Sequence, residues 1–135
     1  MIVYSATMGY RHASIEPGVA AVLEIANNNR QQQSPTTIAN NNGWSAEHTE
    51  DPAALILALD SVDAVVFFST TGDVLDDAQQ IAAQQWFEAG NGWVGVHAAA
   101  DCEYDWPFYE KLVGAWFSSL LRGATPPKAS LTHCF

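Results

Sequence analysis

Short apolar runs alternate with segments of helical spacing along this 135-residue chain. The apolar runs are rich in β-branched and aromatic residues, which favours strands. Strands are predicted at residues 2–5, 44–49 and 63–69, and in the run from residue 92 that ends at His97. Helices are predicted at residues 17–26 and 52–59, from Asp76 or Asp77 to a C-cap at Gly90, and at residues 107–117.

This alternation of strands and helices predicts an α/β fold in which a parallel sheet carries helices on both faces. Residues 27–42 interrupt the pattern, because they are rich in Asn and Gln and present no periodic apolar face, so a mobile surface loop is predicted there. The length allows one domain at most, and a hydrophobic content of 48% is enough to bury a core.

A sharp turn is predicted where the last strand ends at His97. Trp93, Val94 and Val96 are typical of a strand covered on both faces, and the small Ala98 leaves room for a strand-to-helix turn. Such a turn resembles a nucleophile elbow, in which this position carries Ser or Cys. The imidazole of His97 therefore excludes covalent acyl chemistry by a hydroxyl or thiol at this position.

Polar loops follow three of the predicted strands. They contain Arg11 and His12, residues 70–73, and residues 97–101. Because ligands bind at the carboxyl ends of the strands in such sheets, we expect the functional site at this edge. His97 and His12 are the candidate acid/base residues, and Asp101 or Asp73 would orient an imidazole or stabilise its cation. The alternatives are that His97 is simply packed and that His12 caps a helix or faces solvent.

Other readings of these polar residues stay open. A zinc site made of His12, His97 and Asp101 would be chemically suitable, but no close-spaced pair of ligands supports it, so no cofactor is predicted. Arg11 either binds a substrate oxygen or pairs with one of the many carboxylates. Asp73, with the two aspartates that follow it, also suits the N-terminus of a helix.

The charge balance excludes several partners. Five Lys and Arg residues against 15 Asp and Glu residues give a net charge of −10, which makes nucleic acid and anionic membranes poor partners. Cys102 and Cys134 indicate neither a disulfide framework nor a structural zinc site. No apolar run is long enough to span a membrane and no secretion leader is recognisable, so a soluble, cytoplasmic protein is expected.

Five segments together resemble the trehalose-utilisation (ThuA-like) family. They are residues 9–15, 67–75, 92–101, 103–107 and 112–114, in the family's order. The resemblance implies a flavodoxin-like fold of the class I glutamine amidotransferase type, with His in place of the amidotransferase nucleophile. It also implies a role in carbohydrate metabolism, with trehalose or a keto-sugar as the small-molecule partner.

The same resemblance extends the candidate site. By analogy with amidotransferases, the Thr70, Thr71 and Gly72 turn lies where part of an oxyanion hole is built, so that Gly72 would present its N–H to a substrate oxygen. Sugar-binding roles are expected for the segment Tyr104, Asp105 and Trp106, whose aromatic faces and carboxylate suit a sugar ring. The alternative is that Trp106 only packs the start of the last helix.

The resemblance covers residues 1–119, whereas residues 120–135 do not align with the family pattern and indicate a C-terminal truncation. Loss of the last part of such a domain would expose apolar surface and favour self-association into a homo-oligomer. Three functions follow: acid/base chemistry on a sugar, a noncatalytic carbohydrate-binding or interaction module, or a fragment without independent activity. Replacing His97 by Asn separates the first two, because it removes turnover and spares binding only in an enzyme.

Overall fold

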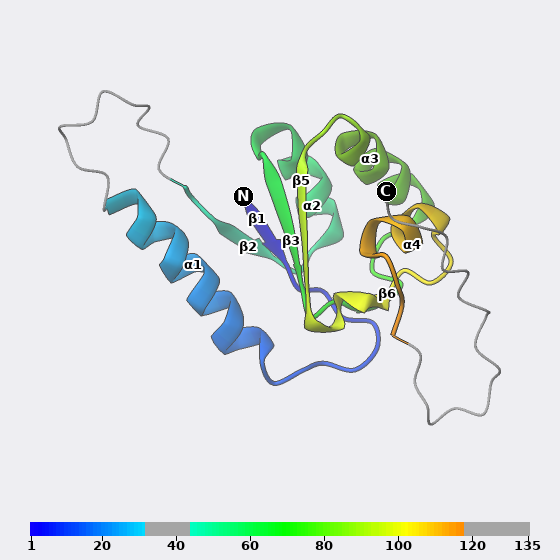
Figure 1. Cartoon of the computed structure of the whole chain (residues 1–135), viewed down its shortest axis with the longest axis horizontal. Helices are drawn as coiled ribbons and strands as arrows, with labels where there is room; N and C mark the ends of the chain where they lie inside the picture. The colour runs from blue at the N-terminus through cyan, green and yellow to red at the C-terminus, as the bar shows by residue number, and fades with distance from the viewer. Residues whose placement is uncertain (32–43, 118–135) are drawn as a thin grey trace.

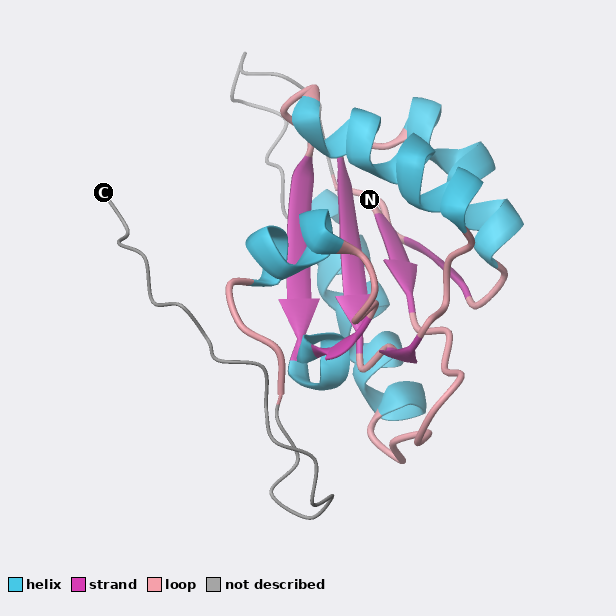
Figure 2. Cartoon of the chain, turned by 90° about the vertical axis from the view of Figure 1, so that its right-hand side faces the viewer, coloured by secondary structure: helices cyan, strands magenta, loops and turns pink. Residues whose placement is uncertain are grey.

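A parallel sheet forms the centre of the structure, a computed structural model that describes residues 1–31 and 44–117. Its strands are β1 (Ile2–Tyr4), β2 (Glu47–Thr49), β3 (Ala64–Phe68) and β5 (Gly92–Val96), in the order β2-β1-β3-β5. All neighbouring pairs are parallel, and Figure 2 shows the arrows pointing the same way. This is the strand order of flavodoxin-like sheets, so the predicted fold class is confirmed.

Helices cover both faces of the sheet, as predicted. Helix α1 (Ile15–Gln31) lies on one face, and α2 (Pro52–Ala58), α3 (Asp77–Glu88) and α4 (Pro107–Val113) lie on the other (Figure 1). Under α1, Ile15 and Val19 pack against Val3 and Val66 of the strands. On the opposite face the larger core contains Tyr4, Phe67, Leu55, Phe87 and Tyr109. Burying apolar side chains on both faces of the strands is the main force that holds these layers together.

Capping residues set the boundaries of the helices. Asp76 accepts a hydrogen bond from the backbone N–H of Gln79 at 2.8 Å, while the Gln79 side chain accepts one from the N–H of Asp76, a capping box that starts α3. The C-cap of α3 is Ala89 rather than the predicted Gly90, and Gly90, with φ of 97°, is the left-handed residue directly after it. Helix α4 stops at Val113 rather than at residue 117, because Gly114 adopts φ of 81° and ends it as a left-handed cap.

The boundaries of α1, β2 and α2 also differ from the expectation. Helix α1 begins at Ile15 and continues to Gln31, so residues 27–31 of the predicted loop are helical, and the rest of that loop to residue 42 lies outside the described residues. The Asn residues lower helix propensity but do not end a helix as a proline in its interior would. Strand β2 is limited to three residues because its partner β1 is equally short. Helix α2 passes into a 3-10 turn, Leu59–Ser61.

A second, smaller sheet lies beyond the carboxyl end of the main one. The predicted turn at residues 70–73 contains strand β4 (Thr71–Gly72), which pairs in parallel with β6 (Asp101–Cys102). A 3-10 helix, His97–Ala100, connects β5 to β6. These two-residue strands have no periodicity, which is why the sequence showed only a turn. They bring the loop after β3 and the segment after His97 together.

Strand β5 differs from the expectation of a strand covered on both faces. Trp93 packs on one face against Phe67 and Tyr109, with ring centroids 6.2 and 5.8 Å apart. Val94 points to the other face and is 50% exposed. Within the described residues β5 pairs only with β3, so it is an edge strand there.

Candidate functional site

His97 occupies a strained turn directly after β5. Its φ is 55°, a left-handed conformation that non-glycine residues rarely adopt, so the predicted sharp turn is present. Ser69 and Glu103 have φ of 54° and 55°, and these three are the non-glycine residues with positive φ in residues 1–31 and 44–117. Ser69 donates its N–H to the carbonyl of Val96 at 3.0 Å, and its buried hydroxyl has no partner among the described residues. Strain and unsatisfied polar atoms concentrated in this way are typical of functional sites.

The imidazole rings of His12 and His97 lie against each other. Their centroids are 4.3 Å apart and the ring planes are tilted by 48°. The Tyr10 ring also contacts His12, edge-on, with centroids 4.8 Å apart. His97 is exposed and His12 is half-buried. The structure therefore brings the two candidate acid/base residues together from loops that follow β1 and β5, and it leaves the His97 ring accessible to a ligand.

Thr71 holds the loop that carries His12. The carbonyl oxygen of Thr71 accepts hydrogen bonds from the N–H groups of Met8 and Gly9 at 2.8 and 3.2 Å, and its hydroxyl donates to the carbonyl of Tyr10 at 3.0 Å. Thr70 and Thr71 are both buried, so their side chains are not at the surface where we expected them to meet substrate. Gly72 is half-buried, with φ of 73°.

The two candidate supporting carboxylates, Asp73 and Asp101, have other surroundings than the predicted ones. Within the described residues no hydrogen bond joins Asp73 or Asp101 to His97. Asp101 instead accepts a hydrogen bond from the hydroxyl of Tyr104, and burial together with this bond raises the pKa of Tyr104. Asp73 is exposed ahead of α3. No direct contact therefore supports the predicted role of either carboxylate in orienting an imidazole.

The segment expected to bind sugar divides into exposed and buried residues. Tyr104 and Asp105 are exposed, and the Tyr104 ring packs beside Trp116 with centroids 5.4 Å apart. Trp106 is buried and stacks on Tyr109 with centroids 5.7 Å apart. Trp106 therefore packs the start of α4, which is the alternative considered for it, while Tyr104 and Asp105 remain available to a ligand.

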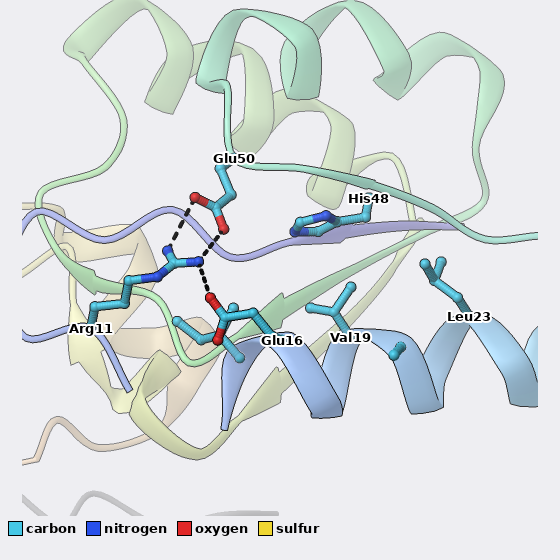
Figure 3. Close-up of a pocket in the computed structure, with 8 residues that line it drawn as sticks. Arg11, Glu16, Val19, Leu23, His48 and Glu50 are labelled. Atoms are coloured by element: carbon cyan, nitrogen blue, oxygen red, sulfur yellow. Dashed lines mark hydrogen bonds and ion pairs between the residues drawn. The ribbon is translucent and has the colours of Figure 1, made fainter. Parts of the chain in front are cut away.

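Arg11 pairs with two carboxylates. Its guanidinium donates to both oxygens of Glu50, at 2.8 and 3.1 Å, and to Glu16 at 2.8 Å (Figure 3). These contacts lower the pKa values of Glu50 and Glu16 and raise that of Arg11. The ion-pair alternative for Arg11 is thus what the structure shows, and Glu50 was not foreseen from the sequence.

A pocket of about 270 Å³ opens between α1 and β2 beside this ion pair (Figure 3). Its polar lining residues are Arg11, Glu16, His48 and Glu50, and the others are aliphatic. His48 lies 2.8 Å from the hydroxyl of Ser5 through its Nε2 atom. Sequence reasoning found no context for His48. The signal that could have identified His48 is its place in β2. The register pairs His48 with Val3 of β1 and so brings the ends of these two strands together.

Glu103 is a buried carboxylate that sequence reasoning also missed. Its Oε1 accepts hydrogen bonds from the N–H groups of Val74 and Leu75, at 2.7 and 2.9 Å, and its Oε2 accepts one from Gln80 at 2.6 Å. Burial nevertheless raises the pKa of Glu103. The preceding Cys102 is a free, buried thiol whose pKa is also raised by burial, and Cys134 lies outside the described residues. Glu103 thus fastens the segment after β6 to the start of α3.

In residues 1–31 and 44–117 no group of three or more His, Cys, Asp or Glu side chains is placed to hold a metal ion. None of the helices described is long and apolar enough to cross a membrane.

Comparison with known families gives one match. The model of the ThuA family, described as trehalose utilisation, matches residues 1–133 and so continues past residue 119, where the motif resemblance ends. The predicted tail, residues 120–135, lies outside the described residues. No curated protein and no solved structure matches the chain. With a match over nearly its whole length, and with a flavodoxin-like parallel sheet, the chain belongs to the ThuA, or trehalose-utilisation, family.

Proposed function

We propose that the chain acts on a sugar or keto-sugar, with His12 and His97 as a pair of acid/base residues. The observation that carries the proposal is the ring contact between the two imidazoles, 4.3 Å between centroids, at the carboxyl edge of a parallel sheet. His97 is exposed there on a strained turn. The family relationship supports carbohydrate metabolism as the setting.

The pair suits proton transfer on a hydroxyl or carbonyl group. One neutral imidazole can accept a proton from a hydroxyl or from a carbon next to a carbonyl, while its protonated neighbour donates a proton to the carbonyl oxygen. In this proposal the N–H of Gly72 binds a substrate oxygen and Tyr104 and Asp105 contact the sugar ring.

A noncatalytic carbohydrate-binding module is the second candidate. It is favoured by the absence, among the described residues, of a hydrogen bond between either imidazole of the pair and a carboxylate. An imidazole without such a partner has no fixed tautomer, which is a disadvantage in catalysis. Its exposed ring can still donate and accept hydrogen bonds with sugar hydroxyls.

The test combines binding and turnover in matched variants. Wild type, His97→Asn and His12→Asn are incubated with a panel of disaccharides and their keto derivatives, and products and affinities are followed by NMR. His133→Asn is the control, because it makes the same chemical change at a histidine that the proposal does not use. We expect His97→Asn and His12→Asn to lose turnover at least a hundredfold, with affinity changed less than about fivefold.

Each other outcome has a definite meaning. Turnover that survives in His97→Asn contradicts the acid/base proposal. Binding without turnover in the wild type supports the noncatalytic module instead. Absence of both binding and turnover across the panel contradicts both candidates.

A further inference from the structure

We propose that Glu50 is a positioning residue for His12 and acts through Arg11. This inference rests on the proposed function only for its catalytic consequence, because its structural consequence can be measured without a substrate. Glu50 follows β2, whereas His12 lies in the loop after β1. The connection between them is a forked ion pair at the residue directly before His12.

The fork is geometrically specific. Two nitrogens of Arg11 donate to the two oxygens of Glu50, and the nitrogen that bonds Oε1 also bonds Glu16 of α1. Figure 3 shows the guanidinium held between these two carboxylates. Single exposed ion pairs contribute little to stability, but a bidentate pair within a network fixes direction as well as distance. The network therefore limits how Arg11 can orient.

The strand end provides a fixed base for Glu50. The register places Tyr4 beside Thr49, and the N–H of Ser5 donates to the carbonyl of Thr49 at 3.3 Å. The hydroxyl of Ser5, which is fully buried, lies 3.2 Å from Oε1 of Glu50. Two neighbouring parallel strands thus hold the carboxylate, and the carboxylate holds Arg11.

The loop around His12 has other anchors on both sides of Arg11. Before His12, Thr71 holds the carbonyl of Tyr10, and after it the N–H of Ile15 donates to the carbonyl of His12 at 3.1 Å. Arg11 lies between Tyr10 and His12 in the chain, and its side chain points toward Glu50 (Figure 3). Releasing Arg11 would let the backbone at His12 rotate and would weaken the contact with the His97 ring.

The experiment compares Glu50→Gln with Glu47→Gln. Each variant removes one negative charge, Glu47→Gln at the start of β2 and Glu50→Gln directly after its end. The exposed Glu47 side chain, however, has no contact with Arg11. The readout is the nuclear Overhauser effect (NOE) between the ring protons of His12 and His97, and thermal unfolding is recorded in parallel. We expect the NOE to fall at least twofold in Glu50→Gln and to stay at the wild-type level in Glu47→Gln.

A second variant keeps the inference open to contradiction if Glu50→Gln does not fold. Arg11→Lys keeps the positive charge but cannot form the fork, so the same loss of ring contact is expected. An unchanged ring contact in folded Glu50→Gln, or in Arg11→Lys, overturns the inference. A lower unfolding temperature with an unchanged ring contact also overturns it, because that is the signature of a purely structural role.

The catalytic consequence is tested separately. If the proposed function is right, Glu50→Gln lowers kcat with a smaller change in KM, whereas Glu47→Gln changes neither. Loss of ring contact in Glu50→Gln together with turnover that survives in His97→Asn would reject the proposed function and leave the positioning role of Glu50 intact.

Discussion

Replacing Glu103 by Ala should destabilise the fold more than any other single change at the carboxyl edge of the sheet. Glu103 is fully buried, and one of its oxygens accepts the N–H groups of Val74 and Leu75. Both of these residues are themselves buried. Alanine would remove the acceptor without admitting an equivalent partner, so two backbone donors would be left unpaired in the interior.

The size of the effect follows from these contacts. An unsatisfied buried N–H costs about 1–3 kcal/mol, so the two donors of Val74 and Leu75 together cost about 2–6 kcal/mol. Part of this is offset, because burial disfavours the charged carboxylate and raises the pKa of Glu103. We therefore expect Glu103→Ala to lower the free energy of unfolding by about 2–4 kcal/mol.

Urea unfolding followed by tryptophan fluorescence measures this difference, since the chain has five Trp residues. Glu103→Gln is the control, because its amide carbonyl can still accept from both N–H groups and its cost should be less than half that of Ala. Equal stability of wild type and Glu103→Ala would refute the reasoning. So would a Gln variant as unstable as the Ala variant.

Three further predictions concern the helices and the buried carboxyl. Asp76→Ala removes the N-cap of α3 and its bond to the N–H of Gln79, and should cost about 1 kcal/mol in urea unfolding. Gly18→Ala places a Cβ 2.1 Å from the ring of Phe68, and overpacking of about 1–3 kcal/mol should outweigh the helix-propensity gain of about 1 kcal/mol, which would appear as a lower unfolding temperature. The raised pKa of Glu103 means that the folded state keeps this proton when the unfolded chain has lost it, above about pH 4.3. Stability from Glu103 is therefore lost as the pH rises through its folded-state pKa, and urea unfolding from pH 4 to 8 should show this part of the loss in wild type but not in Glu103→Gln.

The fold could be predicted well from the sequence because its main strands are buried, and buried strands leave a simple pattern of apolar residues in the sequence. Val65 and Phe67 form one face of β3 and Val66 lies on the other, so an uninterrupted apolar run is the expected pattern for a strand between two layers of helices. Asp76 at the start of α3 and Gly90 just after its end were equally local signals. The end of α4 was misplaced because Gly114 was not recognised as a left-handed cap.

The candidate site could be predicted only where it depends on strand ends. His12 and His97 meet because both follow parallel strands, and that placement can be worked out from topology. The contacts of Glu50 and Glu103 depend on register and on the two-residue strands β4 and β6, which leave no periodic trace in the sequence. For the same reason the burial of Thr71, which turns its hydroxyl to the carbonyl of Tyr10, could not be foreseen.

The most direct test of the central claim is the NOE between the imidazole ring protons of His12 and His97 in the wild-type chain. The account predicts a strong effect, because the ring centroids are 4.3 Å apart, and predicts its disappearance in His97→Asn. A folded wild-type chain that shows no contact between the two rings would contradict the account, since the proposed acid/base pair would then not exist.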